Sequence, residues 1–338
     1  MNEASIGIGP AQAAQGLPPV FEWGLEVIRA IQRAQTPVLT GLTSAIAAPA
    51  ASGALYVSLV LFLLWWIDEK RGLRLGILLI VSAWINVYLK NILGQPRPFN
   101  LDPSVGMAYA SGYGAPSGHA QLSMSFWVPA AAWLGSVWAR RQRVVWVTAV
   151  FVILLAGFSQ VYLGLHFPTG ILAGWMLGGA ALFVLFVPGP RIEGLLLKGG
   201  VRLQNISVAA IALCMNGLFP QERAFPALFL GFCLGYTMMK QRFPFSARGE
   251  INGKKPGAQV MLLRCFTGVA GVAVLFLALR LILPGEGSLF RDIPAWGPDS
   301  PVYDIGLFVR YGILGFWASA GAPRLFQRMA LAQPAAND

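Results

Sequence analysis

The chain has 338 residues, of which 56% are hydrophobic and 12% are charged. Soluble domains carry roughly 25% charged residues, so this composition excludes an ordinary soluble protein and indicates a polytopic membrane protein. The net charge of +11 falls between apolar segments rather than in one basic patch, which argues against nucleic-acid binding. Each cysteine lies in an apolar segment without metal-ligand spacing, so we expect small buried hydrophobic side chains at Cys214, Cys233 and Cys265.

The first fifty residues are less apolar than the rest of the chain. Residues 1–19 lack the basic segment and apolar core of a signal peptide, so we expect a mobile tail without a cleaved signal. Residues 20–33 mix apolar and charged side chains at helical spacing, which predicts an amphipathic helix in the plane of the membrane interface. The milder segment 34–51 is expected to form a short or re-entrant helix.

From residue 53 onward, apolar segments long enough to cross or nearly cross a bilayer follow one another. We expect nine spans, or ten if residues 20–50 also cross. The predicted fold class is therefore all-α, a polytopic bundle of membrane helices. The expected spans are 53–67, 74–93, 118–138, 144–163, 168–188, 203–219, 225–240, 259–283 and 303–321.

Basic residues occupy every second gap between these spans, and the positive-inside rule places those gaps in the cytoplasm. The other gaps hold the loop with Arg97 and Ser117 and the turn with His166, which we therefore expect on the outer face. This pattern fits a bacterial inner membrane protein whose site faces the periplasm or the outside. The basic gap residues are Lys70, Arg71, Arg74, Arg140, Arg141, Arg143, Arg191, Lys198, Arg202, Lys240, Arg242, Arg248, Lys254, Lys255, Arg324 and Arg328.

Three short stretches on the expected outer face carry polar chemistry. Two cations, Lys90 and Arg97, flank a turn that contains glycine and proline. Ser117 is placed to cap the helix that begins at Gly118, and the free N–H groups of such a helix terminus bind anions. The chain has two histidines, and both stand near predicted helix starts: His119 and His166.

Each of these features also has a purely structural reading. Lys90 can extend its ammonium group to the interface, Ser117 can serve only as a cap, and His166 can be an interface histidine. Their gathering on one face favours a shared role instead, because phosphoryl transfer needs cations, a helix N-terminus and proton donors around one phosphate. One imidazole can attack phosphorus while the other protonates the leaving alkoxide.

The three stretches resemble the signature of the type 2 phosphatidic acid phosphatase superfamily, which is Lys-x6-Arg-Pro, Pro-Ser-Gly-His and Ser-Arg-x5-His-x3-Asp. The first two motifs match fully at 90–98 and 116–119, and the third matches at Ser159 and His166. The resemblance implies that His166 is the nucleophile and that His119 is the acid and base. It further implies no metal or other cofactor, and a phosphate held by Lys90, Arg97, Ser117 and Gly118.

Two positions depart from the third motif. Gln160 stands where the family has an arginine, which removes a fixed charge and a bidentate donor from the expected phosphate site. Gly170 stands where the family has an aspartate, so no carboxylate at that position can orient His166. Thr169 or Asp102 are candidates to replace it, and Gln160 is kept as a candidate phosphate-binding residue.

The resemblance covers roughly residues 20–190, which we expect to form the catalytic membrane domain. Residues 191–338 would add about four spans of unknown role. Within them, Arg264 and Arg280 are expected to extend to the membrane interface, and Gly231 and Gly235 to mark helix packing.

The predicted function is removal of phosphate from a lipid or isoprenyl (di)phosphate through a phosphohistidine. One alternative is a catalytically weakened homologue that binds or translocates lipid phosphates, which the losses at 160 and 170 would favour. Another is a phosphotransferase, because the same covalent intermediate can pass its phosphoryl group to an acceptor other than water. The sequence leaves the lipid and the oligomeric state open.

Overall fold

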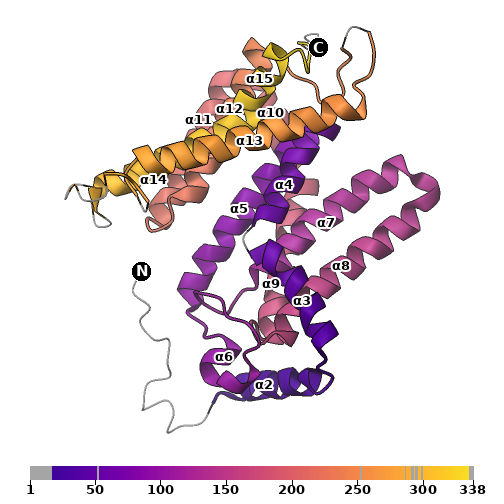
Figure 1. Ribbon diagram of the computed structural model, residues 1–338, viewed down its shortest axis with the longest axis vertical. Helices are drawn as coiled ribbons and strands as arrows, with labels where there is room; N and C mark the ends of the chain where they lie inside the picture. The colour runs from indigo at the N-terminus through magenta and orange to yellow at the C-terminus, as the bar shows by residue number, and fades with distance from the viewer. Residues whose placement is uncertain are drawn as a thin grey trace. The chain divides into compact units, whose positions relative to one another are not determined.

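The computed structural model describes residues 17–51, 53–251, 253–285, 287–290, 293, 296–297 and 300–334, and the expected tail at 1–19 lies almost wholly outside them. Across this described part the regular structure is helical, with two isolated β-bridges. The chain forms two compact units, and Figure 1 shows their helices. Unit 1 comprises residues 1–56 and 85–186, and unit 2 comprises residues 57–84 and 187–338.

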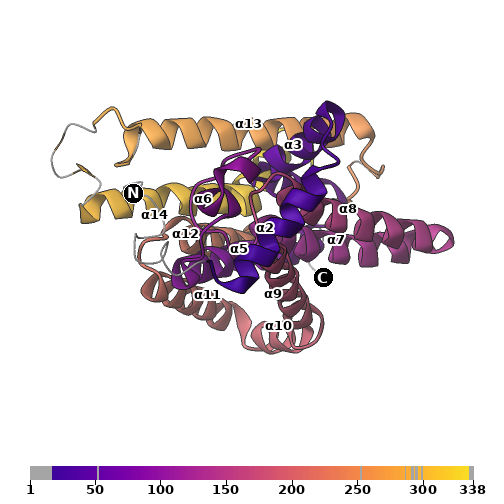
Figure 2. The same cartoon turned by 90° about the horizontal axis from the view of Figure 1, so that it is seen from below.

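Unit 1 contains the three motif stretches. Its α7 (Gly118–Val137) and α8 (Gln142–Tyr162) form a long antiparallel hairpin, visible in both Figure 1 and Figure 2. The next helix, α9 (Pro168–Phe186), packs against α7. The remaining elements are α2 (Pro19–Gln32), α3 (Pro37–Ala51), the C-terminal end of α5 (Glu69–Leu93) from residue 85 onward, α6 (Pro98–Leu101), and the short 3-10 turns Pro103–Val105 and Ala139–Arg141.

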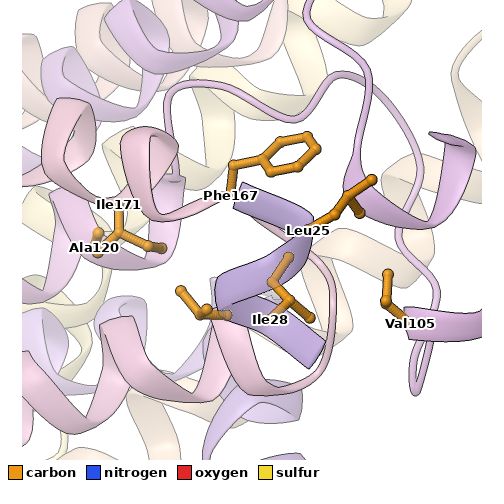
Figure 3. Packing of buried hydrophobic residues seen from close by; sticks show 7 residues of the cluster. Leu25, Ile28, Val105, Ala120, Phe167 and Ile171 are labelled. Atoms are coloured by element: carbon orange, nitrogen blue, oxygen red, sulfur yellow. The ribbon is translucent and has the colours of Figure 1, made fainter. Parts of the chain in front are cut away.

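The predicted amphipathic segment forms α2, whose apolar face covers the α8–α9 turn. Leu25 and Ile28 of α2 are buried against Phe167, as Figure 3 shows. Gly24 permits this contact, since a Cβ at residue 24 would lie 2.5 Å from the ring of Phe167. Gln32 donates to the carbonyl oxygen of Tyr162 at 2.8 Å. Helix α2 therefore holds the turn that carries His166 in place. The location of α2 at the membrane interface stays a prediction.

Unit 2 contains the rest of the chain. Its elements are most of α4 (Ala54–Phe62), the π-helical turn η1 (Leu63–Ile67), residues 69–84 of α5, α10 (Gly189–Lys198), α11 (Gly200–Leu218), α12 (Ala224–Arg242), α13 (Ala258–Ile282), α14 (Pro301–Phe316), the π-helical turn η5 (Trp317–Gly321) and α15 (Ala322–Arg328). Helices α12 and α14 pack closely, because Gly231 faces Gly312 and Gly235 faces Phe316. The packing role expected of these glycines is confirmed.

Six helices in the described part are long and apolar enough to cross a membrane, and the protein is an integral membrane protein. They are Glu69–Leu101, Ala139–Tyr162, Pro168–Phe186, Gly200–Leu218, Ala258–Ile282 and Pro301–Arg328. All nine expected spans form helices, and these six are among them; for the other three, crossing of the membrane stays a prediction. Helices α7 and α12 form where spans were expected, but polar residues in the first turns of α7 and at the end of α12 make them less apolar. Residues 54–67 form an apolar helix that is too short.

Two side-chain expectations for unit 2 are wrong. Arg264 does not extend to the interface: its side chain is fully buried and donates to the carbonyl oxygens of Leu331 and Ala247. Cys214 is exposed on α11 rather than buried. The domain limits 20–190 and 191–338 stay a prediction, although the compact units differ from them because residues 57–84 pack with the C-terminal part.

Candidate active site

The turn that carries His166 is encoded by a helix-ending motif. Helix α8 ends at Tyr162, and Gly164 follows with a φ of 68°, a conformation that favours glycine. Its N–H donates to the carbonyl oxygen of Val161, while the N–H of Leu165 donates to that of Gln160. These two bonds form a Schellman motif. Pro168 then begins α9, so the imidazole of His166 is held between two defined helix ends.

The His166 ring is fully enclosed, and both of its nitrogens have partners. Nδ1 lies 2.6 Å from the carbonyl oxygen of Gly114, and Nε2 lies 3.3 Å from the guanidinium of Arg97. A carbonyl oxygen only accepts, so Nδ1 carries the proton and Nε2 of the neutral ring presents its lone pair. Burial, followed by the charges of Arg97 and Lys90, holds the pKa of His166 well below its usual range. The neutral ring is therefore the stable form.

Arg97 is the centre of this region. It is 3% exposed and follows the turn at the end of α5, at the start of α6. Its guanidinium donates to the carbonyl oxygens of Gly112 at 2.9 Å, Ser111 at 2.9 Å and Leu165 at 3.0 Å. It thereby joins three segments that are far apart in sequence. Its remaining contact, to His166, can pass to a phosphoryl oxygen once Nε2 is bonded to phosphorus.

The Gly114 carbonyl takes the place expected for a side-chain acceptor. Gly114 is held by its own N–H, which donates to the carbonyl oxygen of Gln95 at 2.7 Å. A Cβ at residue 114 would lie 2.5 Å from the carbonyl oxygen of Pro96, so the two loops meet at this glycine. The expected substitute Asp102 lies elsewhere, because its carboxylate pairs with Arg29 at 2.6 Å. His166 bonds to the Gly114 carbonyl rather than to Asp102 or Thr169.

Gly170 belongs to a glycine stripe that lets α9 approach the start of α7. A Cβ at residue 170 would lie 3.1 Å from the Gly114 carbonyl oxygen, and one at Gly174 would lie 2.5 Å from that of Ser117. The Gly170 carbonyl oxygen also accepts from the Ser117 N–H at 2.9 Å. Residues spaced four apart share a helix face, and small ones allow close backbone approach. A side chain at residue 170 would therefore crowd the Gly114 carbonyl that bonds to His166.

Ser117 caps α7 as predicted, with its Oγ accepting from the Ala120 N–H at 3.4 Å. The N–H groups of Gly118 and His119 in the first turn have no intrahelical acceptor, as at any helix N-terminus. Gly118 is close to Asn86 of α5, since a Cβ at residue 118 would lie 3.2 Å from its Oδ1. The capped helix terminus is thus present in the structure, and its binding of an anion stays a prediction.

Sequence reasoning missed two buried amides that position this terminus. Asn86 Nδ2 donates to Gln121 Oε1 at 2.7 Å and to the Pro116 carbonyl oxygen at 3.3 Å. Asn86 is 5% exposed and Gln121 is 1% exposed. The sequence does show an amide side chain within each of two apolar helical segments. Polar groups in such segments usually have a hydrogen-bond partner or a function, so this pattern could have identified both residues.

The second histidine lies under α3. Nε2 of His119 lies 3.1 Å from the carbonyl oxygen of Ala47, so this nitrogen carries a proton and Nδ1 is the nitrogen free for proton exchange. Thr40 and Tyr162 share a hydrogen bond of 2.8 Å, which attaches α3 to the end of α8. The segment expected as a short or re-entrant helix is thus the element that covers His119.

Lys90 and Gln160 complete the set of predicted residues. Lys90 is near enough to His166 to act on its pKa, together with Arg97 and His119, so these four groups are brought together. Gln160 is fully buried, and its Nε2 lies 3.4 Å from Ser159 Oγ. Its carbonyl oxygen also accepts from the His166 N–H at 3.2 Å. Gln160 therefore supports the His166 turn through its backbone.

The chain is similar in part to several known proteins. The chain is 29% identical over 125 residues to an undecaprenyl-diphosphatase of Sulfolobus acidocaldarius, covering 34% of this chain and 55% of the relative. It is 28% identical over 148 residues to glucose-6-phosphatase 3 of Mus musculus, covering 38% and 42%. It is 28% identical over 117 residues to phosphatidylglycerophosphatase B of Bacillus subtilis, covering 34% and 56%. The matches span about half the length of these relatives.

Two family descriptions cover separate parts of the chain. Residues 71–191, which contain all three motif stretches, match the PAP2 superfamily. Residues 224–334, which extend from α12 to the end of the described chain, match the transmembrane extension of PAP2 superfamily phosphatases. With the site residues gathered in unit 1 and the extension in unit 2, the chain belongs to the PAP2 (type 2 phosphatidic acid phosphatase) superfamily.

Proposed function

We propose that the protein removes phosphate from a lipid or isoprenyl (di)phosphate through a phosphohistidine at His166. The observation that carries the proposal is the bond from Nδ1 to the Gly114 carbonyl, which puts the proton on Nδ1 and the lone pair on Nε2, where it faces the Arg97 guanidinium. Burial and neighbouring positive charge also hold the pKa of His166 low, so the ring stays neutral and nucleophilic in weakly acidic solution. A backbone acceptor thus does what the family's aspartate does elsewhere.

The reaction proceeds in two steps. In the first, Nε2 of His166 forms a bond to phosphorus while the bond from phosphorus to the lipid oxygen breaks. His119, protonated at both ring nitrogens at this stage, gives its Nδ1 proton to the leaving alkoxide and keeps the Nε2 proton on the Ala47 carbonyl. In the second, His119 takes a proton from water, the water oxygen bonds to phosphorus, and the nitrogen–phosphorus bond breaks. Arg97, Lys90 and the N–H groups at the start of α7 stabilise the charge on the phosphoryl oxygens.

The position of the site supports a lipid substrate. Lys90 is near the end of α5, and His166 lies between two helices of membrane length. A head group at this level keeps its acyl or isoprenyl chain in hydrocarbon. The names of two relatives, an undecaprenyl-diphosphatase and a phosphatidylglycerophosphatase, point the same way. We place the site on the outer face, because the basic loops alternate with the loops that carry the motifs.

The test is phosphate release by the purified full chain in detergent with a metal chelator present. The substrates are phosphatidic acid, phosphatidylglycerophosphate, undecaprenyl diphosphate and, since one relative is a glucose-6-phosphatase, glucose 6-phosphate. We expect release from a lipid phosphate that His166→Ala lowers at least about 1,000-fold, and a phosphoenzyme that is labile to acid in His119→Ala. Release that persists in His166→Ala would contradict the mechanism. Binding without release would favour the alternative of a lipid-phosphate-binding homologue.

A further inference from the structure

A groove in unit 2 lies where α12 meets η5 and α15. Its volume is about 270 Å³, and its wall includes the apolar side chains of Met238, Phe243, Phe316 and Trp317. Its rim carries two cations, Arg324 and Arg328. An apolar wall beside paired cations has the polarity of a site for an amphipathic anion.

The two arginines are four residues apart on α15 and therefore share one helix face. Both are exposed, and within the described residues neither forms a salt bridge with a carboxylate. Arg324 instead lies over the ring of Phe243, 5.2 Å from its centroid, and donates to Gln327 Oε1 at 3.3 Å. The rim thus holds two positive charges that the nearby protein does not neutralise.

The groove also lies at the end of a helix of membrane length. Residues Pro301–Arg328 form a continuous helix long enough to cross a membrane, and both arginines are in its last two turns. Phospholipid phosphates lie at this level, and basic pockets between membrane helices bind anionic head groups. Trp317, one turn or more further in, lies where the first part of an acyl chain would run.

We propose that this groove binds one anionic phospholipid, with its phosphate between Arg324 and Arg328 and an acyl chain along Phe316 and Trp317. The residues lie outside the three motifs, so the proposal does not depend on the proposed phosphatase reaction. The charge of the rim selects against zwitterionic lipids, which carry no net charge for the two guanidinium groups to neutralise.

The experiment uses the full chain in detergent micelles and phosphatidylglycerol with brominated acyl chains, whose phosphate is a diester without a terminal phosphate group. Quenching of Trp317 fluorescence, taken as the difference between the wild type and Trp317→Phe, reports occupancy of this groove alone. We expect saturable quenching by phosphatidylglycerol. In Arg324→Gln/Arg328→Gln the midpoint should rise roughly 25-fold, about fivefold for each arginine.

Two matched variants make the result decisive. Arg140→Gln/Arg141→Gln removes the same charge from an exposed basic pair in unit 1 and should leave the midpoint unchanged. Arg324→Lys/Arg328→Lys keeps the charge and should bind within about threefold of the wild type. Equal quenching by brominated phosphatidylcholine, an unchanged midpoint in the glutamine pair, or full displacement by millimolar inorganic phosphate would each overturn the proposal.

Discussion

Nδ1 of His166 donates to the backbone carbonyl oxygen of Gly114 at 2.6 Å, in a protein whose third motif lacks the usual aspartate. A carbonyl oxygen carries no proton at any ordinary pH, so it fixes the tautomer as a carboxylate would. It lacks the full negative charge that would stabilise a cationic ring. The candidate site therefore keeps a fixed tautomer of His166 and lacks the electrostatic stabilisation that a carboxylate would give the ring.

This relationship predicts that restoring the family residue will not restore activity. A Cβ at residue 170 already lies 3.1 Å from the Gly114 carbonyl oxygen, and a carboxylate beyond it would repel that oxygen or displace it from His166. We expect Gly170→Asp to lower kcat at least about 10-fold. Gly179→Ala in the same helix is the control, since a Cβ there meets nothing closer than 3.6 Å. A rise in kcat in Gly170→Asp would show that the carboxylate fits.

The sequence predicts those features of the site that depend on the identity of a side chain. The Ser117 cap and the convergence of His119, His166, Arg97 and Lys90 follow from side chains in motifs, and the structure brings them together. The acceptor for His166 is a backbone carbonyl from a loop 52 residues away, so no residue type marks it.

The same limit explains the error at Arg264. A guanidinium in an apolar span usually reaches for water or a carboxylate. Here Nε and Nη1 donate to backbone carbonyl oxygens at a chain turn and near the C-terminal end of the described chain, while the buried Nη2 has no hydrogen-bond partner among the described residues. These contacts arise only from tertiary folding. Composition and periodicity predict the helices themselves, because burial in lipid requires long apolar helical segments.

The low pKa of His166 predicts the pH dependence of stability. In the unfolded chain the ring takes up a proton near pH 6.5, whereas in the folded chain its burial keeps it neutral to lower pH. The unfolded state therefore binds more protons below pH 6.5, and stability falls as the pH drops below that value. We expect the Tm of the wild type to fall more steeply between pH 6.5 and 5 than that of His166→Gln. Parallel Tm curves would show that the ring titrates normally.

Arg97 is predicted to be irreplaceable by lysine. Lysine has three donors at one point and cannot bond to the carbonyl oxygens of Ser111, Gly112 and Leu165 together. We expect Arg97→Lys to lower the free energy of unfolding by about 2–4 kcal/mol and kcat at least about 100-fold. Arg29→Lys is the matched control, because Arg29 is half exposed and its pair with Asp102 is worth less than about 1 kcal/mol. Similar losses in both variants would contradict the prediction.

We expect Arg264 to stabilise unit 2 without any part in the candidate site. Its guanidinium holds the carbonyl oxygens of Ala247 at 2.7 Å and Leu331 at 2.9 Å, and it lies over the ring of Phe245. Arg264→Met keeps much of the apolar stem but leaves both carbonyl oxygens buried without a donor, so we expect a loss of about 2–4 kcal/mol in the free energy of unfolding.

Arg280, near the other end of α13 and exposed, supplies the control for this variant. Arg280→Met should change the free energy of unfolding by less than about 0.5 kcal/mol, because surface charges away from buried networks contribute little. Denaturant titration in one detergent compares the two variants, and proteolysis after residue 328 reports whether the C-terminal end has come loose from Arg264. A loss of stability in Arg264→Met with the C-terminal end still protected would mean that the Ala247 contact, rather than the Leu331 contact, dominates. Equal stability of both methionine variants would show that the buried guanidinium is dispensable.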